Sequence, residues 1–64
     1  MEVKTGTVVS VAPEDPEAIV VVDINGKAVS IAEDLREVRG RNLERGDAVS
    51  LAFDELGAAA AILW

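Results

Sequence analysis

Residues 18–31, with the sequence AIVVVDINGKAVSI, predict a β-hairpin that turns at Asn25-Gly26. Asn-Gly is a strong signal for a two-residue hairpin turn, because both turn residues need a positive φ angle that Gly and Asn tolerate. The turn predicts a register in which Ile24 lies opposite Lys27. This register gathers Val20, Val22, Val29 and Ile31 on one face and Asp23, Ala28 and Ser30 on the other. We expect the first face to pack into the core, because a shift by one residue would bury Asp23.

Three further strands are predicted from alternating side chains. Residues 3–12 alternate but are interrupted by Gly6, which is typical of a bulge or bend where a long first strand serves both halves of a small barrel. Residues 48–53 alternate with Val49, Leu51 and Phe53 toward the core. Residues 58–64 are alanine-rich, yet a seven-residue terminal helix would be marginal in water, so we expect a strand there.

One short helix is predicted between the third and fourth strands. Ile31, Leu35 and Val38 follow the helical spacing i, i+4, i+7, and Gly40 stands where a helix end favours a left-handed residue. Acidic residues 33 and 34 would occupy the first turn, and arginines 36 and 39 the last, which suits the helix dipole. We expect about two turns of helix.

Three connections are predicted by their turn-forming residues. Residues 13–17 contain two prolines, which remove donors from a strand ladder, and therefore predict a loop. Residues 41–47 connect the helix to the next strand, with Leu43 turned inward, and residues 54–57 predict a hairpin turn. The element order is strand, strand, strand, helix, strand, strand.

This order predicts an all-β fold for a single domain that spans residues 1–64. The expected architecture is a five-stranded OB-like β-barrel with one short helix between strands 3 and 4. An SH3-like barrel with the same number of strands is the alternative, and the helix favours the OB-like arrangement. A closed barrel would also leave no exposed sheet edge.

Composition restricts the partners that the chain could bind. The net charge is −6, so the molecule repels polyanions, and we expect no nucleic-acid partner. No apolar run reaches the roughly 18 to 20 residues that a membrane span needs, so we expect no membrane partner and a soluble, cytoplasmic protein. The chain lacks Cys and His, so its stability must come from β structure or from oligomerisation.

The residue types also restrict the chemistry. Without His, Cys or Tyr, and with no Ser, Thr or Lys spaced as a nucleophile–base pair, the chain is predicted to be no enzyme and to have no catalytic residue. Glu14, Asp15 and Glu17 lack the spacing of a calcium loop, so we predict no metal site. No cofactor-binding motif is present, and we expect no cofactor.

Four arginines form the only basic segment of the chain, and they are Arg36, Arg39, Arg41 and Arg45. Residues 36–45 carry a net charge of +2, from four Arg and two Glu. Because guanidinium groups match the geometry of oxyanions, these residues are a candidate anion-binding site. The alternative is that they compensate the helix end and pair with neighbouring acids or with a second subunit.

Four segments carry a resemblance to a known family, and they are residues 6–11 (GTVVSV), 18–26 (AIVVVDING), 43–49 (LERGDAV) and 61–63 (AIL). They resemble the molybdate-binding (Mop) and transport-associated OB (TOBE) domains. The resemblance implies a small OB barrel and a site for molybdate or tungstate, formed near the helix start and after the fourth strand. Here residues 32–34 (AED) and 54–58 (DELGA) occupy those two places, where carboxylates would repel an oxyanion.

A second resemblance covers residues 26–36 and Gly46-Asp47, which are similar to swapped-hairpin transition-state regulators. This likeness implies dimers that bind DNA. Ala32 stands where that family favours proline, and the acidic total charge opposes binding to DNA.

Several features together are typical of a designed or strongly idealised sequence. These are the Asn-Gly turn, the charges that suit the helix dipole and the absence of Cys, His, Tyr and Gln. We therefore expect a non-enzymatic scaffold or self-associating module with no evolved ligand, and residues 58–61, all alanine, would allow close approach in a homo-oligomer. The alternative is a Mop- or TOBE-like module that senses a small oxyanion at a site between subunits.

Overall fold

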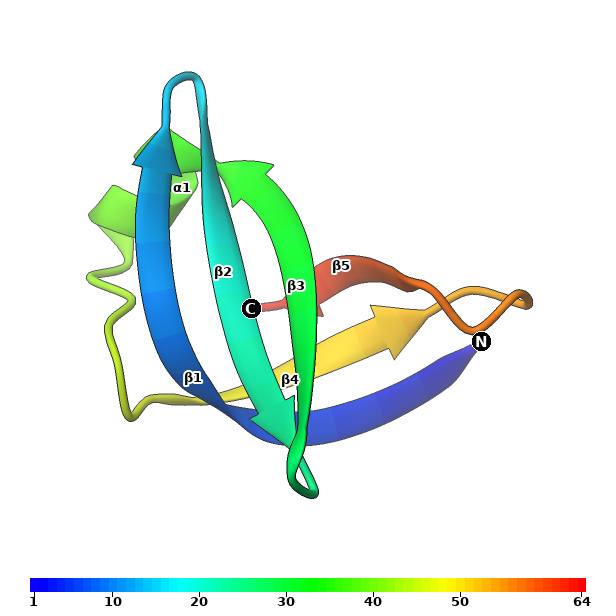
Figure 1. Ribbon diagram of the computed structural model, residues 1–64. Helices are drawn as coiled ribbons and strands as arrows, with labels where there is room; N and C mark the ends of the chain where they lie inside the picture. Colours follow the sequence, from blue (N-terminus) through cyan, green and yellow to red (C-terminus); the bar gives the residue numbers. More distant parts are fainter.

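The computed structural model describes residues 1–64 as one antiparallel sheet that curls into a half-barrel (Figure 1). Its elements are β1 (Glu2–Glu14), β2 (Glu17–Ile24), β3 (Lys27–Asp34), α1 (Leu35–Gly40), β4 (Ala48–Phe53) and β5 (Ala59–Leu63). The strand order across the sheet is β3-β2-β1-β4-β5, so β4 pairs with β1 and not with its sequence neighbour β3. The predicted five strands, with a helix between the third and the fourth, are confirmed.

The central hairpin has the predicted register. Ile24 lies opposite Lys27, and the pairing continues as predicted to Val20 opposite Ile31. Asn25 and Gly26 take φ angles of 54° and 84°, as their turn requires. The predicted inner face is buried, except that Val29 is half-buried at its edge.

Strand β1 serves both halves of the sheet, as predicted. Its first part pairs with β4 as far as Thr7, and from Thr7 onward it pairs with β2. The bulge is at Val9, which has no partner, and not at Gly6. Gly6 has a different role: a Cβ there would lie 2.5 Å from the carbonyl oxygen of Asp23. Glycine therefore lets β1 and β2 cross closely, and the bulge three residues later bends the strand.

The prediction of a loop at residues 13–17 is wrong. Strand β1 continues through Pro13, which pairs with Ala18, and only Asp15-Pro16, joined by a cis peptide, form the turn. At Pro13 β1 pairs with β2 alone, and an edge position of this kind tolerates the missing proline donor.

The helix begins later and ends differently from the prediction. Strand β3 runs on to Asp34, which is the N-cap of α1, so the acid in the first turn is Glu37. Gly40 is the last helical residue and has no left-handed φ; Asn42 takes that conformation, with φ 53°. Gly40 stays helical because the next residue, Arg41, is the C-cap, and its backbone N–H still donates to the Glu37 carbonyl, at 3.1 Å. With six residues, α1 is far too short to cross a membrane.

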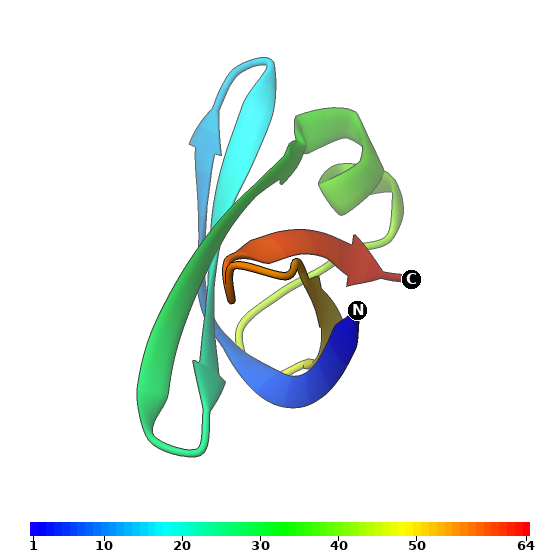
Figure 2. The same cartoon turned by 90° about the vertical axis from the view of Figure 1, so that its right-hand side faces the viewer.

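The core lies between the two halves of the curled sheet. Figure 2 shows β2, β3 and the second part of β1 on one side, and β4, β5, α1 and the start of β1 on the other. The buried cluster consists of Val8, Ala18, Val20, Val22, Ile24, Ile31, Leu35, Val38, Val49, Leu51, Phe53 and Ile62. The two edge strands, β3 and β5, approach each other but form no ladder, so the barrel is open along this seam.

Candidate functional site

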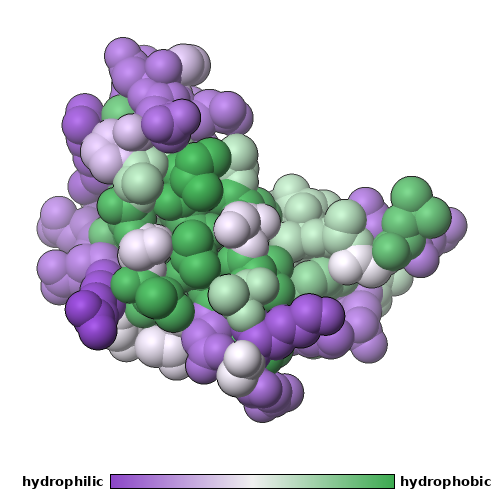
Figure 3. All heavy atoms as spheres, viewed as in Figure 1, coloured by the Kyte–Doolittle hydropathy of each residue, from purple (hydrophilic) through white to green (hydrophobic).

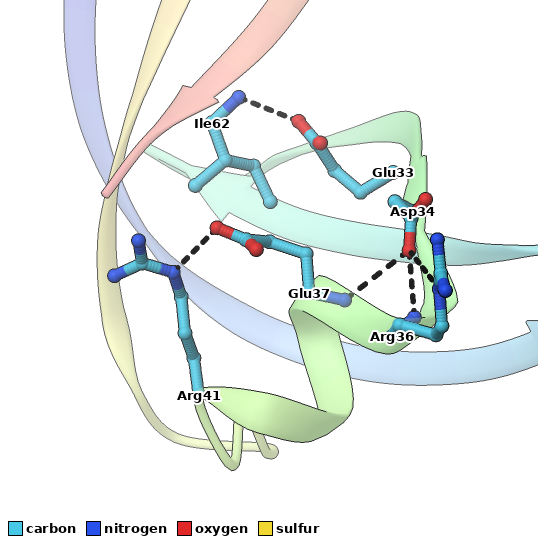
Figure 4. Close-up of polar contacts among 6 residues, drawn as sticks. All are labelled: Glu33, Asp34, Arg36, Glu37, Arg41 and Ile62. Atoms are coloured by element: carbon cyan, nitrogen blue, oxygen red, sulfur yellow. Dashed lines mark hydrogen bonds and ion pairs between the residues drawn. The ribbon is translucent and has the colours of Figure 1, made fainter.

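The four arginines do not converge on one pocket. Arg36, Arg39 and Arg41 each line a different shallow hollow, and Arg45 lines none. Figure 4 shows Arg36 at the start of α1 and Arg41 at its end. Each lies beside an acid of its own: the Arg36 Nε is 4.0 Å from the Asp34 carboxylate, and the Arg41 Nε donates to Glu37 Oε1 at 2.8 Å.

Arg41 has a second contact that holds it in place. Its guanidinium lies 4.9 Å from the centroid of the Trp64 ring, within the range of a cation–π interaction. The side chain thus connects the end of α1 to the residue that follows β5, and Glu37 holds its other side. This arrangement fits the alternative interpretation, in which the arginines compensate nearby acids and stabilise local structure.

The Mop and TOBE resemblance assigns two places to an oxyanion. At both places, carboxylates of the chain already accept hydrogen bonds from the backbone amides. At the helix start, Asp34 Oδ1 accepts from the amides of Arg36 and Glu37, at 2.8 and 3.3 Å (Figure 4). In the turn after β4, Asp54 Oδ1 accepts two backbone N–H groups, at 2.9 and 3.0 Å. An oxyanion would therefore compete with a covalently tethered carboxylate at both places.

The arrangement of polar side chains offers little for metal binding or catalysis. No group of three or more carboxylates converges on a point that could hold a metal ion. The side-chain hydroxyls of Thr5 and Ser50 lie 3.2 Å apart, but neither is hydrogen-bonded to a carboxylate or an amine. This pair therefore lacks the base that would activate a hydroxyl nucleophile.

The two lysines of the chain line one hollow, a feature that our sequence analysis missed. Lys4 comes from the start of β1 and Lys27 from the tip of the β2–β3 hairpin. The Lys4 ammonium lies 5.2 Å from the centroid of the Phe53 ring, which forms part of the floor. The alternation of β1 places Lys4 on the same face of the strand as buried Val8. Only the folded chain brings Lys27 to the same hollow as Lys4.

The outer face of β1, β2 and β3 carries no charge over its central rows. Figure 3, which views this face, shows an apolar area with hydrophilic residues above it, below it and to its left. Two rows of paired residues run across it, and they are Ser10–Val21–Ser30 and Ala12–Ile19–Ala32. Val9, at the bulge, adds a large apolar side chain that is 44% exposed. An acidic row of Glu14, Glu17 and Asp34 lies at the end of the face next to the β1–β2 turn, and Asp23, in the row Thr7–Asp23–Ala28, lies at the other end.

No family model, curated protein or solved structure matches the chain. The likeness to Mop and TOBE domains is therefore a prediction carried by the residues quoted above. The fold and surfaces define the chain as a small five-stranded β module with an uncharged outer face and a lysine-lined hollow.

Proposed function

We propose that the protein is a non-enzymatic, idealised β scaffold that associates with a second copy of itself through the outer face of β1, β2 and β3. The observation that carries this proposal is the absence of charge from the two central rows of that face. In a chain with 18 charged residues among 64, two adjacent rows of Ala, Ser, Val and Ile are unusual on a solvent-facing surface.

The distribution of charge favours a two-fold arrangement of copies. Three acids, Glu14, Glu17 and Asp34, form a row at one end of the face, and a single acid, Asp23, lies at the other end. A two-fold axis in the plane of the interface, perpendicular to β2, would set β2 antiparallel to its copy, so the two rows of three acids would lie at opposite ends of the interface. Two chains of charge −6 then meet at their uncharged rows, where repulsion is least.

The size of the face sets the expected strength of association. Eight-residue strands span about 26 Å, and three strands are about 14 Å wide. The area of the face, which is the product of these two lengths, is smaller than the ~800 Å² per partner of a standard interface. Ala and Ser side chains permit close approach of two sheets, at a spacing of about 10 Å. We expect a weak dimer, one that dissociates in the micromolar to millimolar range.

An idealised origin is supported by agreement between local and global features. No buried side-chain nitrogen or oxygen lacks a hydrogen-bond partner. Asp34, Asp47 and Asp54 each accept from backbone amides in their own turn or cap. Such consistency between turns, caps and packing is what a design procedure selects.

The two ligand-binding alternatives have less support. Oxyanion sensing would need amides that Asp34 and Asp54 already occupy, and arginines that converge. DNA binding by a swapped-hairpin dimer is opposed by the charge of −6.

A charge placed on the outer face tests the proposal. Ser30 is exposed in the central row beside Val21, so Ser30→Lys should abolish association by placing two ammonium groups at the interface. Ala58→Lys adds the same charge in the exposed turn before β5 and serves as the control. Light scattering during gel filtration should find a monomer for Ser30→Lys alone, with unchanged circular dichroism in both variants. Equal association of the two variants would refute the proposal.

A further inference from the structure

We propose that the hollow lined by Lys4 and Lys27 binds a small carboxylate whose apolar body is an aromatic ring or a short alkyl chain. The hollow lies between the start of β1, the tip of the β2–β3 hairpin and the end of β4. The lining residues that carry the proposal are Lys4, Ile24, Asn25, Lys27, Val29 and Phe53.

The position of Lys4 favours an anionic ligand. Lys4 pairs with Leu51, whose side chain is fully buried, so Lys4 lies on the core face of β1. Lysine is rarely placed on such a face unless its ammonium reaches water or an anion. Here the stem reaches the mouth of the half-barrel, and the ammonium lies over the ring of Phe53.

The charge around the hollow is positive, which also favours an anionic ligand. In a chain of charge −6, its only two lysines meet at this hollow, and no carboxylate lines it. The nearest acid to Lys4 is Glu2, whose Oε1 is 3.5 Å from the Lys4 Nζ on a side chain that is 68% exposed. An exposed ion pair of this kind contributes little, so the carboxylate of a ligand can replace Glu2.

The floor of the hollow favours a ligand with an apolar body. Ile24 and Phe53 are buried and Val29 is half-buried, so the surface beneath the two ammonium groups is apolar. The carboxamide of Asn25 supplies a neutral hydrogen-bond donor on the same rim. Two cations, one amide and an apolar floor match a molecule that is anionic at one end and hydrophobic at the other. The volume, about 250 Å³, limits the apolar body to one ring or a short chain.

This site is independent of the proposed self-association. Lys4, Ile24 and Phe53 belong to the inner side of the curled sheet, whereas the proposed interface is its outer side. A monomeric Ser30→Lys variant should therefore still bind the ligand.

Titration with phenylacetate, followed by ¹H–¹⁵N NMR of the full chain, tests the proposal. We expect the largest amide shifts at Asn25, Lys27 and Gly57, which line the hollow, and no comparable response to phenylacetamide or to inorganic phosphate. Lys4→Gln and Lys27→Gln should each weaken binding by about five- to tenfold, because each removes a charge-assisted contact. Arg45→Gln removes the same charge from an exposed loop residue that lines no hollow, and it should leave binding unchanged.

Three results would overturn the proposal. Equal binding of phenylacetamide would show that the lysines contribute nothing, and equal shifts with phosphate would show attraction by charge alone. Equal weakening by Arg45→Gln would show that only the net charge matters. Lys27 is an exposed residue at a hairpin tip, so Lys27→Gln stays informative even if Lys4→Gln reduces stability.

Discussion

Glu33 Oε1 accepts a hydrogen bond from the backbone N–H of Ile62 at 2.8 Å (Figure 4), and this contact joins β3 to β5. These strands are the two edges of the sheet, and no ladder connects them. The Glu33 side chain therefore joins the two edges of the sheet at one point, whereas a row of backbone hydrogen bonds joins them in a closed barrel. Because Ile62 is buried, its N–H has no ready access to water when Glu33 is removed.

Replacing Glu33 by alanine should lower the free energy of unfolding by about 1 to 3 kcal/mol, the usual cost of leaving a buried donor unpaired. Glu33→Gln keeps an acceptor oxygen and should cost less. Glu44→Ala, which removes an exposed carboxylate with no side-chain partner, is the control. Urea unfolding measures the differences, and amide exchange at Ile62 should accelerate in Glu33→Ala. If Glu33→Ala and Glu44→Ala are equally stable, the seam contact contributes nothing.

Two glycine substitutions should have opposite effects. A Cβ at Gly6 would lie 2.5 Å from the Asp23 carbonyl and 2.7 Å from two side-chain carbons, so Gly6→Ala should destabilise by about 3 kcal/mol or abolish folding. A Cβ at Gly40 would meet no atom within 4 Å, and Gly40 is helical, so Gly40→Ala should stabilise by about 0.5 to 1 kcal/mol. Thermal and urea unfolding of both variants check this. A stable Gly6→Ala protein would contradict the close crossing of β1 and β2.

The cap of α1 should contribute measurably to stability. Asp34→Ala removes the acceptor of two helix amides and should cost about 0.5 to 2 kcal/mol. Asp34→Asn keeps a capping oxygen and should retain most of that stability. The same loss in both variants, measured by urea unfolding, would mean that the charge matters and the cap does not.

Oxyanions should leave the unfolding temperature unchanged. The amides at the helix start and after β4 are occupied, so millimolar molybdate, tungstate or phosphate at low salt should not stabilise the native state by linkage. Arg36→Ala and Arg39→Ala should behave like the wild type in the same thermal scans. A rise in midpoint specific to one anion, and absent from Arg36→Ala, would instead support a sensing function.

Local sequence patterns predicted the central hairpin and β4 well. At Asn25-Gly26 the turn chemistry specifies the register, and alternation then specifies which residues are buried. The helix end was mispredicted because Gly40 and Asn42 both suit a left-handed conformation, and the choice between them depends on backbone contacts after Arg41.

The lysine-lined hollow could not be predicted from local patterns. Its two cations come from β1 and from the β2–β3 hairpin, and they meet only through the curl of the sheet. The seam contact between Glu33 and Ile62 depends in the same way on how β3 approaches β5. Features that join distant strands require the three-dimensional arrangement, whereas turns and faces do not.

Self-association through the outer face predicts a molecular mass that depends on concentration. Sedimentation equilibrium of the wild-type chain, from about 10 µM to 1 mM, covers the range in which an interface smaller than the standard size dissociates. We predict an average mass that rises from that of one chain toward that of two, with no larger species. The mass of one chain at every concentration would contradict self-association and leave the protein a monomeric scaffold.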